Sequence, residues 1–179
     1  MILLRHGQTM FNVLFGQSRQ DPGLIDPPLT EEGRTQALAA AGRLAAEGVT
    51  RLVASPYTRS LETAHLIADR LRLPVTVDHR VRERCAYACD IGTVRSTLER
   101  AFGHFGFGVF EEQWWPDTEE PEAALAARCD DFRRSMAAAG DWRTVAVVTH
   151  WGVIRALTGQ RIKNCEAIRF DPTAPPPPS

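Results

Sequence analysis

Three segments of the sequence place histidine or arginine directly after, or a few residues beyond, a short apolar run. The first is Arg5-His6-Gly7, the second runs from Ser55 to Arg59, and the third runs from Thr149 to Gly152. In open α/β sheets, ligands bind beyond the carboxyl ends of the strands. We therefore expect two histidines and two arginines from distant parts of the chain to meet at one edge of a sheet.

This combination of side chains is typical of a phosphate pocket. The guanidinium groups of Arg5 and Arg59 offer planar forks of donors that match phosphoryl oxygens. A neutral imidazole is a competent nucleophile near neutral pH, and a covalent intermediate divides a difficult displacement into two easier steps. Helix N-termini after residues 55 and 150 would add backbone donors. The sequence thus predicts phosphoryl transfer through a histidine of this pocket, for which His6 is our candidate.

The leaving group of such a reaction needs a proton. Glu83 stands between two arginines just after a predicted strand and is our candidate general acid, provided that its surroundings keep it protonated. Asp90 lies in the same poorly patterned connection and is the alternative. Asn12 is a candidate polar contact to the phosphoryl group, although an asparagine at this place could equally cap a turn.

Strand and helix patterns alternate along the chain. Strands are expected at residues 2–5, 51–54, 75–77, 144–148 and 167–170. Helices are expected at residues 30–47, from the Ser55-Pro56 start signal to about residue 71, and at residues 94–102, 120–139 and 152–157. On the first of these helices the inward face is expected to carry Ala37, Leu38, Ala41, Leu44 and Ala45. The alternation predicts a largely parallel sheet covered by helices on both faces.

Length and composition restrict the possibilities further. A chain of 179 residues fits one domain, expected over residues 1–171, followed by a Pro-rich extended tail over residues 172–179. With 21 basic and 22 acidic side chains, the net charge of −1 argues against nucleic acid as a partner. There is no signal-peptide pattern and no apolar run of membrane-spanning length. The four cysteines are therefore expected to be reduced thiols of a cytoplasmic protein, and nothing in the sequence indicates an oligomeric state.

Two other groups of residues have a less certain role. Cys85 and Cys89 lack a second ligand pair, so we expect no metal and no cofactor. Trp114 and Trp115 are expected to cover the core or to roof the pocket. Trp151, directly after His150, is expected either to shape substrate choice or to pack inward.

The three segments resemble, in the same order, the three signature blocks of the histidine phosphatase superfamily, also called phosphoglycerate-mutase-like. The resemblance rests on residues 4–9 with Asn12, on residues 55–64 and on residues 149–152. It implies a three-layer α/β/α sandwich and a metal-independent branch-1 phosphatase. It further implies that His6 is the phosphorylated nucleophile and Glu83 the proton donor. The residues around the phosphate would be Arg5, Asn12, Arg59 and His150.

Departures from the family pattern favour a phosphatase over a mutase. Gln8 replaces the glutamate that mutases usually carry, and the chain is short for a cofactor-dependent mutase. We therefore expect hydrolysis of the phosphomonoester of a small metabolite; the alternatives are a phosphoglycerate-type mutase and a non-catalytic phospholigand-binding protein on the same fold. The substrate is expected to be selected by residues 13–28 and 84–118. Sugar phosphates, phosphoglycerates, nucleotides and phosphorylated protein side chains all fit the sequence.

Overall fold

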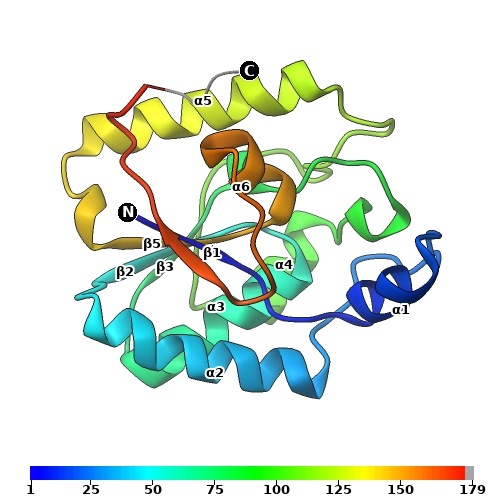
Figure 1. The fold of residues 1–179 in the computed structure, drawn as a ribbon, viewed down its shortest axis with the longest axis horizontal. Coiled ribbons are helices and arrows are strands. Elements are labelled where there is room, and N and C mark those ends of the chain that lie inside the picture. The colour runs from blue at the N-terminus through cyan, green and yellow to red at the C-terminus, as the bar shows by residue number, and fades with distance from the viewer. Residues whose placement is uncertain (176–179) are drawn as a thin grey trace.

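The computed structural model describes residues 1–175, which fold around one six-stranded sheet (Figure 1). The strands lie in the order β4-β3-β2-β5-β1-β6, and only β6 runs antiparallel to its neighbour. Their bounds are β1 Ile2–Arg5, β2 Arg51–Ala54, β3 Val75–Val77, β4 Gly106–Phe107, β5 Val145–Thr149 and β6 Ala167–Arg169. Because β1, β5 and β2 are parallel neighbours, the segments that follow them emerge at the same edge of the sheet.

Helices cover both faces of the sheet, with α2 and α3 on one side and α5 and α6 on the other (Figure 1). The α-helices are α1 Met10–Ser18, α2 Glu31–Ala46, α3 Thr58–Leu71, α4 Arg95–Ala101, α5 Glu122–Ala139 and α6 Trp151–Thr158. Short 3-10 turns occupy η1 His79–Val81, η2 Ala88–Asp90 and η3 Trp142–Thr144. The predicted three-layer α/β/α sandwich with a mostly parallel sheet is confirmed.

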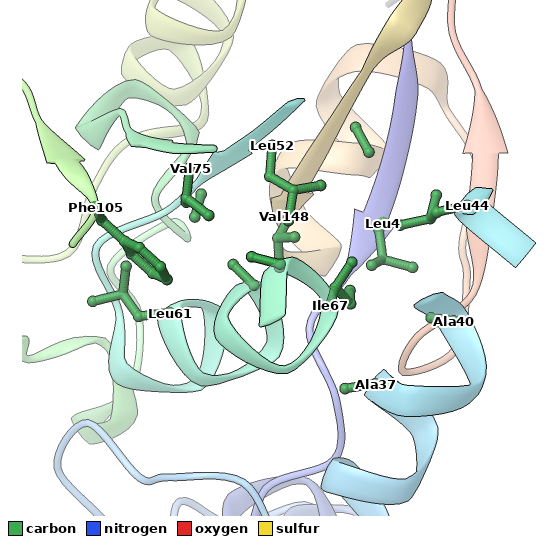
Figure 2. Close-up of a cluster of buried hydrophobic side chains, with 14 of the residues drawn as sticks. Leu4, Ala37, Ala40, Leu44, Leu52, Leu61, Ile67, Val75, Phe105 and Val148 are labelled. Atoms are coloured by element: carbon green, nitrogen blue, oxygen red, sulfur yellow. The ribbon is translucent and has the colours of Figure 1, made fainter. Parts of the chain in front are cut away.

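The core consists of two hydrophobic layers, one on each face of the sheet. Successive side chains of a strand point to opposite faces, so Leu4 and Val148 pack toward α2 and α3 while Leu3 and Val147 pack toward α5 and α6. Figure 2 shows the first layer, in which Leu4, Leu52, Val75 and Val148 meet side chains of the two helices. The sheet is therefore buried on both faces, as its apolar strands predict.

Two sequence-based predictions about helix packing were wrong in detail. Helix α3 begins at Thr58 rather than at the Ser55-Pro56 signal. The Ser55 hydroxyl contacts His150 Nε2 at 2.7 Å, and no side chain caps the helix. On α2, Leu38 is 49% exposed and Ala45 is exposed as well, while Ala40 is fully buried. Apart from Leu44, the buried residues of α2 are small, which allows α3 to approach closely.

Two elements had no predicted counterpart. Helix α1 starts at a capping box formed by Thr9 and Asn12. The backbone N–H of Asn12 donates to Thr9 Oγ1, and the backbone N–H of Thr9 donates to Asn12 Oδ1. Strand β4 has only two residues at the edge of the sheet, too few for a sequence pattern. The uncertain position of Trp114 is also settled, since its ring packs in the core against Tyr57 with centroids 4.6 Å apart.

The C-terminal end of the described chain lies against α5. Arg133 donates hydrogen bonds to the carbonyl groups of Pro172 and Ala174. Of the predicted tail over residues 172–179, residues 176–179 lie outside the described part, and the domain boundary at residue 171 stays a prediction. Among residues 1–175, no helix is both long and apolar enough to cross a membrane.

The start of α2 touches the backbone that follows β1. Thr30 caps α2 by accepting from Gly33 N at 3.0 Å, and the Thr30 amide donates to Gln8 O at 2.9 Å. A Cβ placed on Gly33 would lie 2.2 Å from Gln8 O, well inside van der Waals contact. This close approach holds the segment after β1, which carries His6, against the helical layer.

We predict that Gly33→Ala lowers the melting temperature, because two backbone segments must separate to admit the methyl group. Overpacking of this kind typically costs about 1–3 kcal/mol. Gly42→Ala, on the same helix with open space around it, is the matched control and should stabilise the protein by up to about 1 kcal/mol. Thermal unfolding followed by circular dichroism distinguishes the two, and equal stabilisation by both would contradict the close approach.

Candidate active site

The structure brings the predicted histidines together at the carboxyl edge of the sheet. Arg5, the last residue of β1, pairs with Thr149 at the end of β5, so His6 and His150 follow side by side. Their ring centroids are 5.1 Å apart. Arg59, in the first turn of α3, lies in the same buried group.

The surroundings of His6 select its tautomer. His6 Nδ1 lies 2.7 Å from Gly7 O, and a carbonyl oxygen can only accept, so Nδ1 carries the hydrogen and Nε2 keeps a lone pair. Burial lowers the pKa of His6 well below its ordinary value, and the charges of Arg59 and Arg5 lower it further. The ring is therefore held neutral, with a nitrogen that can attack phosphorus.

His150 is fully buried behind His6. Its Nε2 lies 2.7 Å from Ser55 Oγ and 3.2 Å from Ser60 Oγ, while its Nδ1 is buried without a partner among the described residues. Burial lowers the pKa of His150 well below the ordinary value, with Arg59 and His6 adding to the effect. Two neutral imidazoles thus stand next to each other, which avoids like-charge repulsion between the rings.

The Arg59 guanidinium is fixed by two hydrogen-bond acceptors and an aromatic ring. It donates to Cys89 O at 2.6 Å and to Asp90 Oδ1 at 3.0 Å, and it lies over the Tyr57 ring at 4.2 Å. Burial alone would lower the pKa of Arg59, but the Asp90 carboxylate raises it above the ordinary value. Arg5 donates to Ile162 O at 3.0 Å, and burial lowers its pKa. Both arginines line the cavity beside His6.

The surroundings of Glu83 favour the protonated form of its carboxyl group. Its carboxyl group accepts from Gly152 N at 3.1 Å and from Arg84 N at 2.8 Å. Burial raises the pKa of Glu83 and the nearby charge of Asp90 raises it further, against the opposing effect of the two backbone donors. A raised pKa keeps a carboxyl group protonated to higher pH, the state that a general acid requires.

Asn12 caps helix α1 and also lines the cavity. Its Oδ1 accepts from Thr9 N at 3.0 Å within the capping box. Asn164, which the sequence analysis missed, donates to Asn12 Oδ1 at 3.2 Å and to His6 O at 3.0 Å. No sequence signal links Asn164 to residues more than 150 positions earlier.

The cavity in front of His6 has a volume of about 1730 Å³, larger than a phosphoryl group requires. An aromatic cluster on one part of its lining consists of Phe11, Phe15 and Tyr87. Trp151 lines another part. Within residues 1–175, no three His, Cys, Asp or Glu side chains gather in a way that could hold a metal ion, and the four cysteines are buried and free.

The family model described as histidine phosphatase superfamily (branch 1) matches residues 1–173. The chain belongs to this family. A glucosyl-3-phosphoglycerate phosphatase of Mycolicibacterium vanbaalenii is 33% identical over 165 residues, which cover 88% of this chain and 72% of that protein. A probable phosphoglycerate mutase of Yersinia enterocolitica is 41% identical, but only over 46% of this chain and 37% of its own length.

A solved structure supports the assignment of this chain to the family. The structure of a mycobacterial glucosyl-3-phosphoglycerate phosphatase complexed with VO3 superposes with a TM-score of 0.67 at 27% identity, covering 93% of this chain and 88% of that chain. The resemblance inferred from the three sequence blocks is confirmed. The relatives that span most of the chain are phosphatases, which favours phosphatase over mutase activity.

The Glu83 carboxyl group occupies the space that a side chain at residue 152 would need. A Cβ on Gly152 would lie 2.3 Å from Glu83 Oε1. Because this oxygen is the end of a flexible side chain, an added methyl group would displace the carboxyl rather than the helix. The glycine of the third signature block is thus explained by the position of Glu83.

We predict that Gly152→Ala leaves the melting temperature of this histidine phosphatase within a few degrees of the wild type. Its phosphatase kcat should fall by about a hundredfold, in the range that loss of a general acid produces. Steady-state kinetics with glycerol phosphate, whose leaving alkoxide needs a proton, measures the effect. Gly42→Ala is the control, and an unchanged kcat in Gly152→Ala would show that the carboxyl position does not matter.

Proposed function

We propose that this histidine phosphatase hydrolyses a phosphomonoester through a covalent phosphohistidine at His6 Nε2. The single observation that carries the proposal is the contact between His6 Nδ1 and Gly7 O, since it leaves Nε2 unprotonated and free to react. The lone pair of Nε2 forms a bond to phosphorus as the bond to the ester oxygen breaks. Glu83 gives its proton to that oxygen, and the alcohol leaves.

The second step restores the enzyme. A water molecule attacks the phosphorus of the phosphohistidine, the Nε2–P bond breaks, and the ionised Glu83 takes the proton of the water. Inorganic phosphate leaves, and His6 and Glu83 return to their starting states. In this proposal Arg5, Arg59 and Asn12 surround the phosphoryl oxygens from the cavity lining, and the buried His150 next to His6 completes the ring through its Nδ1, which has no partner among the described residues. The two arginines supply the positive charge that stabilises the transition state.

We assign the proton to Glu83 rather than to Asp90. The carboxylate of Asp90 already bonds Arg59 Nη2 and accepts from Ala86 N and Tyr87 N at 3.2 Å each. Those contacts occupy both of its carboxylate oxygens. The raised pKa of Glu83 favours the protonated form at the start of the reaction.

The proposed substrate is a small phosphorylated metabolite, and no metal or cofactor takes part. Relatives that cover most of the chain are named for glucosyl-3-phosphoglycerate, a phosphorylated sugar acid of suitable size for the cavity. We further propose a single catalytic domain over residues 1–171 and a cytoplasmic location, which the four free thiols support.

We predict that His6→Ala lowers phosphate release by about a thousandfold or more, because no other group replaces the nucleophile. Release from p-nitrophenyl phosphate is measured with and without a metal chelator, and protein quenched in alkaline detergent is tested for protein-bound phosphate that acid then releases. Wild-type activity should survive chelation, and only the wild type should carry this phosphate. Release that persists in His6→Ala, or that disappears on chelation, would refute the mechanism.

The protonation state of Glu83 predicts a pH dependence. A raised carboxyl pKa means that the protonated donor is abundant at low pH and is lost as pH rises through the folded-state pKa. The ratio of wild-type to Glu83→Gln kcat/KM should therefore increase as pH falls from about 8 to about 5 with glycerol phosphate as substrate. The ratio cancels the ionisation of the substrate itself. A ratio that grows with rising pH would exclude Glu83 as the initial proton donor.

A further inference from the structure

Five arginines line the cavity outside the proposed phosphate site, and two of them, Arg155 and Arg161, lie against the same tryptophan. Arg155 on α6 lies over the Trp151 ring at 5.4 Å, and Arg161, just after the helix, lies over the same ring at 5.9 Å. All three side chains line the cavity. Trp151 immediately follows His150, so this cluster of two arginines and one tryptophan is joined directly to the active-site edge of the sheet.

The acidic side chains around the cavity do not neutralise these arginines. Glu119 and Glu122 pair with Arg84, and Asp130 pairs with Arg133 and Arg134. Glu83 and Asp90 belong to the phosphate site. Among residues 1–175, Arg155 and Arg161 make no ion pair or side-chain hydrogen bond, and both are exposed. The cavity therefore carries positive charge that is not compensated within the described chain.

We propose that Trp151, Arg155 and Arg161 form a subsite for a second acid group, a carboxylate or a phosphate, in the alcohol part of the substrate. This inference rests on the proposed function and adds the substrate class. Each guanidinium can bind two anionic oxygens through its planar fork, and stacking on the indole limits its freedom before the ligand arrives. The cavity volume of about 1730 Å³ leaves room for a substrate that reaches from His6 to α6.

The first test compares substrates that differ in the second acid group. 3-Phosphoglycerate carries a carboxylate, fructose 1,6-bisphosphate carries a second phosphate, and glycerol 3-phosphate carries neither. We expect the wild type to prefer at least one of the first two over glycerol 3-phosphate by about tenfold or more in kcat/KM, the value of one charged hydrogen bond. The preferred compound identifies the acid group. No preference for either would overturn the proposal.

The second test removes the cations. The double variant Arg155→Ala/Arg161→Ala should lose most of this preference through a higher KM, while its rate on p-nitrophenyl phosphate stays within about twofold, because that substrate has no second acid group to lose. Arg143→Ala is the matched control, since Arg143 lies over Trp142 at 4.3 Å but does not line the cavity. Equal losses on all substrates, or no loss on any, would refute the subsite.

A binding measurement separates failure of the subsite from failure of the proposed chemistry. Calorimetric titration of the His6→Ala variant with 3-phosphoglycerate, fructose 1,6-bisphosphate and glycerol 3-phosphate needs no turnover. Adding the Arg155→Ala/Arg161→Ala changes should weaken binding of the compounds with a second acid group by about tenfold, and should leave glycerol 3-phosphate unaffected. If the wild type hydrolyses nothing but this difference persists, the catalytic proposal fails and the subsite stands. If hydrolysis occurs and the difference is absent, the subsite fails alone.

Discussion

The parallel pairing of β1, β5 and β2 governs the rest of the structure. The register aligns Arg5 with Thr149 and Ala54 with Val148, so the three strands end at nearly the same level. Parallel strands must be joined by crossover connections, and here helices supply them on both faces of the sheet. The segments after the strands consequently converge at one edge, although those after β1 and β5 lie more than 140 residues apart in the chain.

This convergence brings the positively charged side chains of Arg5 and Arg59 together at a buried site. Two features of the structure offset the cost of burying these charges. Carbonyl oxygens of Cys89 and Ile162 accept from Arg59 and Arg5, and the buried Asp90 carboxylate neutralises Arg59 directly. The two histidines remain neutral because burial and the neighbouring arginines lower their pKa values. One consequence is a nucleophilic ring beside positive charge, with no proton occupying its free nitrogen.

Asp90 connects the two halves of the site. Its charge raises the pKa of Arg59 and adds to burial in raising the pKa of Glu83. The same carboxylate therefore keeps the phosphate-side arginine charged and favours the protonated form of Glu83. A buried ion pair of this kind is sensitive to the loss of one partner, which typically costs about 3–5 kcal/mol. Asp90 thus acts on the pKa values of both groups.

The sequence by itself determined the fold class and the residues that meet at the sheet edge. Apolar runs ending at Arg5-His6, Ala54 and Thr149 predict parallel strands, and the three blocks resemble one family. Only the tertiary structure decided the tautomer of His6, the partner of Arg59 and the raised pKa of Glu83, because these depend on Gly7 O, Asp90 and burial. The same holds for Asn164, which reaches His6 across 158 residues of sequence. Pattern and spacing encode local structure, whereas hydrogen-bond partners and desolvation arise only when distant segments pack together.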